Sequence, residues 1–376
     1  MPGTTRGVSG HIGGHDGDIP TVSRGSERLS QSKEPTRFGR IFPPDDAWLA
    51  RQPREPALDP DLPMIDTHHH LWHRPDHRYL LDDFLADLRT GHNVVATVFV
   101  ECNAMYRADG PEEMRPVGQP EFVAGVAAMS ESGGYGPVRV AAGIVGFADL
   151  TLGDRVDAVL EAHVRAGGGR FRGVRHPGGW DASDVIGNSH EITAPHLFRH
   201  PDFRAGLRRL TALGLSFDAW LFHPQLADVI DLARAFPDAN IIMGHVGGAL
   251  GYGPYEGRRD EVFASWKASM TELARCPNVT LKLGGMVMRL AAFDYKSMEA
   301  PPSSAELAAF WRPYMGTCIE LFGPDRCMFE SNFPVDKMGT GYATLWNAFK
   351  RIAAGASGDE KLALFSGTAR RAYRLP

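Results

Sequence analysis

Histidines stand where they could chelate a metal ion or move protons. Residues 64–72 have the sequence Met-Ile-Asp-Thr-His-His-His-Leu-Trp. If this stretch is a strand, Asp66, His68 and His70 point to one face and the intervening side chains to the other. Two imidazoles one strand repeat apart can bind one divalent metal ion. The alternative is a polar turn or a nucleic-acid contact. The metal interpretation is favoured because further histidines follow later apolar runs.

Short apolar runs alternate with helical stretches from residue 63 onward. Eight runs are predicted strands, over residues 64–68, 93–102, 138–146, 170–176, 215–222, 240–245, 279–284 and 326–332. The predicted helices cover residues 80–90, 120–130, 153–166, 203–213, 224–236, 258–275, 304–322 and 339–354. Such alternation implies parallel strands with crossover helices, and eight units imply a closed (β/α)8 TIM barrel of the α/β class. A last helix over residues 365–373 is expected to close the barrel.

The active site of such a barrel lies at the carboxyl ends of its strands. Four strands deliver histidines there, and others deliver charged or amide groups, together His68, His70, Glu101, Arg175, His176, His223, His245, Lys282, Glu330 and Asn332. We expect His68, His70 and His223 to form a metal triad that leaves one position open for water. His245 is expected to be a fourth ligand or to donate to a developing oxyanion.

Composition limits the class of protein. The chain has 376 residues, 43% of them hydrophobic, and a net charge of −5, which is typical of a soluble globular protein and a poor match to nucleic acid. No run approaches the roughly 20 apolar residues of a membrane helix, and no apolar secretion signal stands at the start. The four cysteines are scattered, which favours buried thiols in a reducing compartment. We therefore expect a cytoplasmic protein.

Two regions differ in composition. Residues 1–39 are rich in Gly, Ser and charge and poor in periodic apolar residues, so we expect a disordered tail. Residues 40–376 are expected to form the barrel domain, with an irregular proline-rich segment at its start.

Several stretches resemble one known family. They are Asp66-Thr67-His68-His69-His70-Leu71-Trp72, Gly244-His245-Val246-Gly247, Asn278-Val279-Thr280-Leu281-Lys282-Leu283-Gly284-Gly285 and Phe329-Glu330-Ser331-Asn332-Phe333-Pro334. These motifs are similar to those of the amidohydrolase superfamily, in particular amidohydrolase-related family 2. Within it the pattern is most similar to lactonases, such as 2-pyrone-4,6-dicarboxylate lactonase and the sugar lactonases, with aromatic decarboxylases as more distant relatives.

The resemblance implies a hydrolase in which water attacks a lactone or amide carbonyl. In the family a strand-eight aspartate takes the proton from that water, often beside a divalent metal, usually zinc. Some lactonases are thought to work without metal. This chain has Asn332 at the aspartate position, and a carboxamide is neither a general base nor a strong metal ligand.

Three interpretations of Asn332 stay open. Glu330 could replace the base, although it could equally be a buried carboxylate paired with Lys282 or Arg175. Asp336 could also reach the site, but a solvent-facing turn acid beside Lys337 is favoured for it. Alternatively His245 or His176 is the base and Asn332 orients water or substrate, or the barrel only binds a ligand.

Cationic strand ends give clues to the substrate. Arg175, with His176 beside it, could bind a substrate carboxylate, or Arg175 could pair with Glu101 or Asp149. Lys282 could hold an anionic group, although a structural barrel cation is slightly favoured.

The sequence therefore predicts a metal-dependent hydrolase of a lactone, amide or other C–N bond in a small organic acid. A metal-dependent decarboxylase of an aromatic or enol acid is the alternative, and a non-catalytic ligand-binding barrel is the third. Catalysis is assigned to His245, Glu330 and Asn332. The expected partner is a small, carboxylated molecule, and a homo-oligomer stays open because oligomers are frequent among the relatives.

Overall fold

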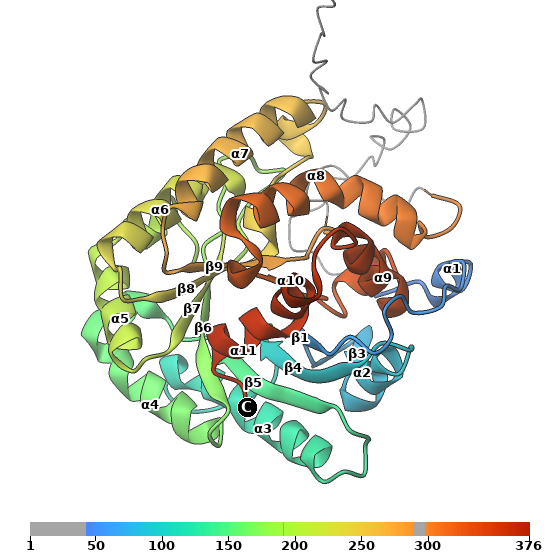
Figure 1. The fold of residues 1–376 in the computed structure, drawn as a ribbon. Coiled ribbons are helices and arrows are strands. Elements are labelled where there is room, and N and C mark those ends of the chain that lie inside the picture. The colour runs from blue at the N-terminus through green and yellow to red at the C-terminus, as the bar shows by residue number, and fades with distance from the viewer. Residues whose placement is uncertain (1–42, 191, 289–297) are drawn as a thin grey trace, which may run out of the picture.

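Eight parallel strands form a nearly closed barrel. The computed structural model describes residues 43–190, 192–288 and 298–376. The strands pair in sequence order as β1 (Met64–His69), β4 (Val94–Val100), β5 (Arg139–Gly146), β6 (Phe171–Pro177), β7 (Ser216–Trp220), β8 (Asn240–Met243), β9 (Val279–Leu283) and β10 (Cys327–Phe329). Figure 1 shows these strands at the centre, with helices around them. The predicted TIM barrel is confirmed.

Each of the eight predicted crossover helices overlaps an observed one. The helices are α1 (Asp46–Leu49), α2 (Leu81–Leu88), α3 (Gly118–Glu131), α4 (Asp157–Ala166), α5 (Pro201–Ala212), α6 (Leu226–Ala235), α7 (Arg259–Ala274), α8 (Ser304–Phe322), α9 (Tyr342–Ile352), α10 (Gly358–Leu362) and α11 (Thr368–Tyr373). Local sequence sets several boundaries. Ser303 and Glu306 form a capping box at the start of α8, and Pro201 opens α5, where its missing N–H costs nothing.

The barrel closes between β10 and β1 through irregular bonds. The backbone amide of Asn332 donates to the carbonyl of His68 at 2.8 Å, and that of His70 donates to the carbonyl of Phe333 at 2.7 Å. Asp66 adds a side-chain tie, because it accepts from the Ser331 amide at 2.9 Å and from the Tyr342 hydroxyl at 3.0 Å. Simple alternation placed Asp66 on the face of His68 and His70. A register irregularity after Asp66 breaks that alternation, and its carboxylate is used in closing the barrel.

The structure departs from the predicted boundaries at three places. Helix α4 starts later than expected because Leu150–Val156 is a 3-10 segment in which Gly153 has a φ of 60°. Strand β10 ends at Phe329, and the chain beyond it turns into the barrel mouth. A two-stranded hairpin, β2 (Trp72–Arg74) with β3 (His77–Tyr79), was not predicted. The Pro75-Asp76 pair between its strands is a turn signal that could have revealed it.

The final helix fills one end of the barrel interior. The interior packs small and branched side chains from the strands against Ala369, Tyr373 and Leu375. Asn240, the first residue of β8, donates to the Ala372 carbonyl at 2.8 Å, so α11 lies at the amino ends of the strands (Figure 1). The predicted closing helix is therefore present, and it leaves the carboxyl ends of the strands for the site.

The remaining predictions about the chain have mixed outcomes. All four cysteines are free and buried, as expected. None of the helices in the described ranges combines the length and hydropathy needed to span a membrane. The tail predicted over residues 1–39 lies outside the described residues.

A buried histidine away from the barrel mouth makes stability depend on pH. The ring of His163 stacks on Phe171 with centroids 5.1 Å apart, and its Nε2 donates to the Phe147 carbonyl at 2.7 Å. Burial lowers its pKa from 6.5 to about 4. Below pH 6.5, His163 therefore binds a proton in the unfolded chain but stays neutral in the folded chain. The contribution of the neutral His163 ring to the free energy of unfolding is fully present above pH 6.5 and is lost as the pH falls toward 4.

We predict that His163→Gln, which keeps an N–H donor, removes this dependence. The difference in unfolding free energy between wild type and variant should shrink by about 1 kcal/mol from pH 7 to pH 5.5, because a neutral buried imidazole costs up to about 1.4 kcal/mol per pH unit there. Urea unfolding at the two pH values measures it. A difference that does not change with pH would contradict the assignment.

Candidate active site

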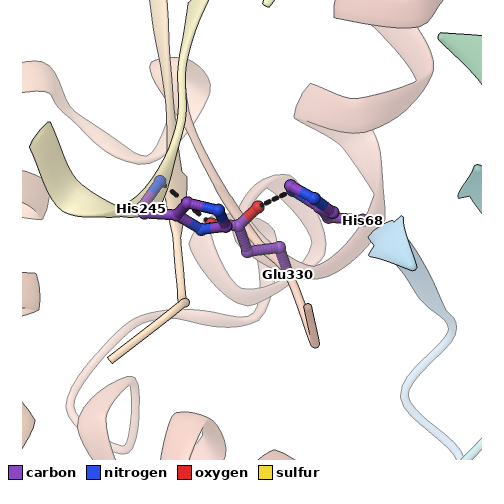
Figure 2. Close-up of side chains that lie close together, drawn as sticks. All are labelled: His68, His245 and Glu330. Carbon is purple, nitrogen blue, oxygen red and sulfur yellow. Dashed lines mark hydrogen bonds and ion pairs between the residues drawn. The ribbon is translucent and has the colours of Figure 1, made fainter. Parts of the chain in front are cut away.

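A buried carboxylate lies between two imidazoles at the carboxyl ends of the strands. His68 Nδ1 donates to Glu330 Oε2 at 2.6 Å, and His245 Nδ1 donates to Glu330 Oε1 at 2.7 Å. The His245 backbone amide donates to the same Oε1 at 3.0 Å. Figure 2 shows the Glu330 carboxylate between the two rings. The sequence had offered Lys282 or Arg175 as partners of Glu330. Its partners are instead two histidines, one from β1 and one from the turn after β8.

Local backbone geometry places His245 over the carboxylate. Both His245 and Val246 have positive φ, of 50° and 46°, in the turn after β8. Gly285, with a φ of 67°, lies beside the ring, and a Cβ there would be 2.2 Å from His245 Nδ1. A glycine is needed at this position both for its backbone conformation and for the room it leaves.

The hydrogen bonds fix the proton positions on three rings. Because Glu330 accepts from Nδ1 of His68 and His245, the lone pair of each neutral ring lies on Nε2. His70 has the same form, since its Nδ1 donates to the Val100 carbonyl at 2.8 Å. The rings of His68 and His70 are 4.8 Å apart, as are those of His68 and His245. Three Nε2 lone pairs are thus gathered at one end of the barrel.

His223 has the opposite form. Its Nδ1 accepts from the Leu250 backbone amide at 3.2 Å, so the neutral ring carries its proton on Nε2. Burial lowers the pKa of His223 to about 4, so the ring stays neutral near pH 7. His223 is therefore arranged as a hydrogen-bond donor.

The surroundings of Glu330, His68 and His70 shift their pKa values. Burial, and then the charge of Lys282, lower the pKa of His68 well below its usual value. Burial and then Arg175 do the same for the pKa of His70. Burial alone would raise the pKa of the Glu330 carboxyl, but His245 and His68 outweigh it and hold that pKa well below its usual value. An ionised carboxylate thus faces neutral His68.

The three residues predicted to bind substrate lie in different surroundings. Arg175 Nε donates to Glu101 Oε1 at 3.0 Å, which is the ion pair that the sequence left as an alternative. Lys282 Nζ donates to Asp218 Oδ2 at 3.0 Å in the barrel interior, where Tyr373 also reaches Asp218. This contact supports the structural role for Lys282.

His176 lies away from the three-ring cluster. It is buried against Phe147 and Phe203, and its Nε2 is 3.3 Å from Asp149 Oδ1. A substrate contact by His176 therefore has no support from its surroundings.

Asn332 is joined to a second buried acid. With a φ of 55°, Asn332 directs its Nδ2 at Asp336 Oδ1, 2.8 Å away. The favoured interpretation of Asp336 as a solvent-facing acid beside Lys337 is wrong, because Asp336 is only 1% exposed and Lys337 pairs with Asp87. Burial raises the pKa of Asp336 well above its usual value, which favours the neutral form of this carboxyl.

The donor chemistry at the three-ring cluster fits a divalent metal ion. Within the described residues, His68, His245 and Glu330 are the group that could hold one, with candidate ligand atoms within 4.8 Å of one another. Metal-binding imidazoles commonly donate their second N–H to a carboxylate or a backbone carbonyl. His68, His245 and His70 all do so. The predicted triad of His68, His70 and His223 is not the group that the structure gathers, since Nδ1 of His223 is engaged by a backbone N–H.

Two further features were missed from sequence. The unpredicted hairpin places Trp72 against His70, with ring centroids 5.6 Å apart, and Arg74 over Trp72 at 4.2 Å. In addition, the Tyr255 hydroxyl donates to Asp181 at 2.7 Å, which joins the loop after β6 to the loop after β8. No local pattern marks this second contact.

The Asn332–Asp336 bond gives a test of the neutral acid. Asn332→Asp would place two carboxyl groups in one buried hydrogen bond, which raises the pKa of the pair further in the folded state. Because the folded state then binds more protons than the unfolded one, stability should fall as pH rises. We expect a loss of about 1–3 kcal/mol at pH 8 and a smaller loss at pH 5. Thermal unfolding at the two pH values measures the loss of stability. Asp336→Asn, which keeps an amide donor and acceptor and cannot ionise, is the comparison variant. Equal loss at both pH values would contradict a protonated Asp336.

Gly285 gives a test of the packing around His245. Gly285→Ala adds a methyl group against the ring, whereas Gly257→Ala is matched in backbone strain, with a φ of 71°, but meets nothing within 4 Å. We expect Gly285→Ala to cost about 1–3 kcal/mol more than its control, the typical cost of overpacking. Denaturant unfolding of both variants measures this. Equal losses in the two variants would contradict tight packing of the His245 ring against Gly285.

Comparison with known proteins agrees with the fold. The amidohydrolase family profile matches residues 65–375. The Sinorhizobium fredii protein y4mH is 32% identical over 84% of this chain and 99% of its own length. An L-fucono-1,5-lactonase of Burkholderia multivorans is 27% identical over 83% and 96%. A solved amidohydrolase structure from Burkholderia multivorans with bound zinc is 26% identical, with a TM-score of 0.63 over 83% of this chain and 99% of that one. The chain belongs to the amidohydrolase family and is a hydrolase of that superfamily.

Proposed function

We propose that the protein hydrolyses the lactone ring of a small organic acid. The observation that carries the proposal is the His245–Glu330 pair, in which a buried carboxylate accepts a hydrogen bond from the Nδ1–H and leaves Nε2 as a base. Such a carboxylate orients the ring and stabilises the imidazolium that forms when the ring takes a proton. The L-fucono-1,5-lactonase relative supports a lactone as the substrate.

The residues divide the reaction between a base and a donor. His245 Nε2 takes a proton from water as the water oxygen attacks the lactone carbonyl. The Nε2–H of His223 donates to the oxygen on which negative charge develops. The ring C–O bond then breaks, and His245 returns its proton to the departing ring oxygen, which yields the hydroxy acid.

The turn after β8 couples these two histidines. Leu250, which donates to His223, lies five residues after His245, and the His223 amide donates to the Gly248 carbonyl at 2.9 Å. One segment thus sets the orientation of both base and donor. Because fixed donors act without reorganising during the reaction, this coupling favours transition-state stabilisation.

A metal ion can be accommodated in the same centre. His68 and His70 would hold it through Nε2, which leaves Nε2 of His245 free as the base, and when bound it would polarise the carbonyl as a Lewis acid. Zinc is the metal we propose, since it suits imidazole ligands and is bound in the related Burkholderia structure.

The wall beside the histidines suits a ring-shaped substrate. Trp220 packs edge-on against His245 with centroids 4.6 Å apart, and Tyr255 packs against His223 at 5.1 Å. Ile186, Phe222 and Leu250 form the apolar cluster behind them. A planar or chair-like ring can lie on such a surface while polar groups fix its orientation. We therefore expect a sugar-acid lactone.

The proposal predicts that His245 and Glu330 act as one unit. On a panel of five- and six-membered aldonolactones, Glu330→Gln and His245→Gln should each lower kcat by at least about a hundredfold, and the double variant should be little worse than either, because paired catalytic groups are not additive. His163→Gln is the control, since His163 lies outside the site. Acid release with a pH indicator measures turnover.

Two results would overturn the proposal. One is turnover of lactones that is unchanged in both single variants. The other is release of carbon dioxide from an aromatic acid by protein that leaves every lactone intact, which would favour the decarboxylase alternative.

A further inference from the structure

An arginine stands directly against one of the three Nε2 lone pairs. Arg175, near the end of β6, places Nη1 3.2 Å from Nε2 of His68. Its side chain is only 13% exposed, so the guanidinium is held within the barrel mouth. Because Nδ1 of His68 donates to Glu330, its Nε2 can only accept, and Arg175 is the donor.

The lone pair that Arg175 uses is the one that a metal ion would need. An sp² ring nitrogen has a single lone pair in the ring plane, so it cannot accept from a guanidinium and ligate a cation at once. A fixed positive charge beside the nitrogen also opposes the approach of a divalent cation. The guanidinium must therefore move away before His68 can serve as a ligand through Nε2.

Glu101 holds the guanidinium in this position. Glu101 Oε1 accepts from Arg175 Nε at 3.0 Å, and the Glu101 backbone carbonyl accepts from Nη2. The second carboxylate oxygen accepts from the Asn103 backbone amide at 3.3 Å, and Asn103 has a φ of 51°. Both partners of the ion pair are thus fixed, at 5% exposure for Glu101. Planar guanidinium groups suit such multidentate contacts.

We infer that Arg175 and a divalent metal ion compete for Nε2 of His68, and that Glu101 is the positioning residue that sets the balance. The arginine lowers the metal affinity of a centre whose other ligands are already oriented. The inference concerns the centre of the proposed function, but it requires no particular substrate. Metal affinity tests it independently of hydrolysis.

The test is zinc affinity measured without substrate, by competition with a chromophoric chelator on the full chain. Arg175→Met should bind Zn²⁺ at least about tenfold more tightly than wild type, since removing a nearby positive charge favours the cation. Glu101→Gln should give a smaller gain, because it releases Arg175 from its ion pair but also removes a negative charge. Arg175→Gln is a second variant in case methionine prevents folding. Arg172→Met is the matched control. It removes a guanidinium from the same strand, where Arg172 donates to the carbonyls of Gly169 and Phe171, and should leave the affinity unchanged.

A double variant connects the effect to His68. Arg175→Met combined with His68→Gln should lose the gain in zinc affinity. The inference is overturned if Arg175→Met and Arg175→Gln bind zinc no more tightly than wild type, or if the gain persists without His68. The proposed hydrolysis would fail separately, through the lactone assay, so the two failures are distinguishable.

Discussion

The site depends on the burial of one ionised carboxylate. Placing Glu330 inside the barrel mouth would cost several kcal/mol if its oxygens had no partners. Three N–H groups, from His68 and from the ring and backbone of His245, compensate for that cost. The same bonds join β1, the end of β8 and the segment after β10, across the seam where β1 and β10 share no regular ladder. The stability of the closed barrel and the orientation of the histidines therefore have a common origin.

The scaffold could be predicted because it follows from local pattern. Strands buried on both faces form short apolar runs, and crossover helices lie between them, so both appear directly in the sequence. The boundaries that failed are those set by single backbone conformations. Gly153 delays the start of α4, and the chain leaves β10 at Phe329, whereas the predicted strand ran to residue 332. The β2–β3 hairpin was not predicted because each of its strands has only three residues, too few to show a pattern of alternation.

The residues of the site could be predicted more readily than their partners. Strand-end position was enough to place His68, His70, His245 and Glu330 at the barrel mouth. Pairing depends on contacts between distant segments, so the partners considered for Glu330 were cations, and its two histidine partners were not foreseen. The face of each side chain was assumed to alternate, but positive φ at His245 and the irregular register after Asp66 break that rule. Asp336 was misassigned for a similar reason, since nothing local shows that the turn carrying it is buried.

This chain has Asn332 where the family pattern has an aspartate. That difference is compatible with hydrolysis once the surrounding charges are considered. A carboxylate at position 332 would lie next to the buried Asp336 and within two residues of the ionised Glu330, and like charges so close cannot all ionise. With the amide, Asp336 accepts a hydrogen bond from a neutral partner, and its raised pKa favours the neutral carboxyl, while Glu330 is the carboxylate that lies between two imidazoles. On the proposed mechanism the proton of the attacking water goes to the His245–Glu330 pair, so no strand-eight carboxylate is required. The asparagine therefore avoids a further buried negative charge beside Asp336 and Glu330.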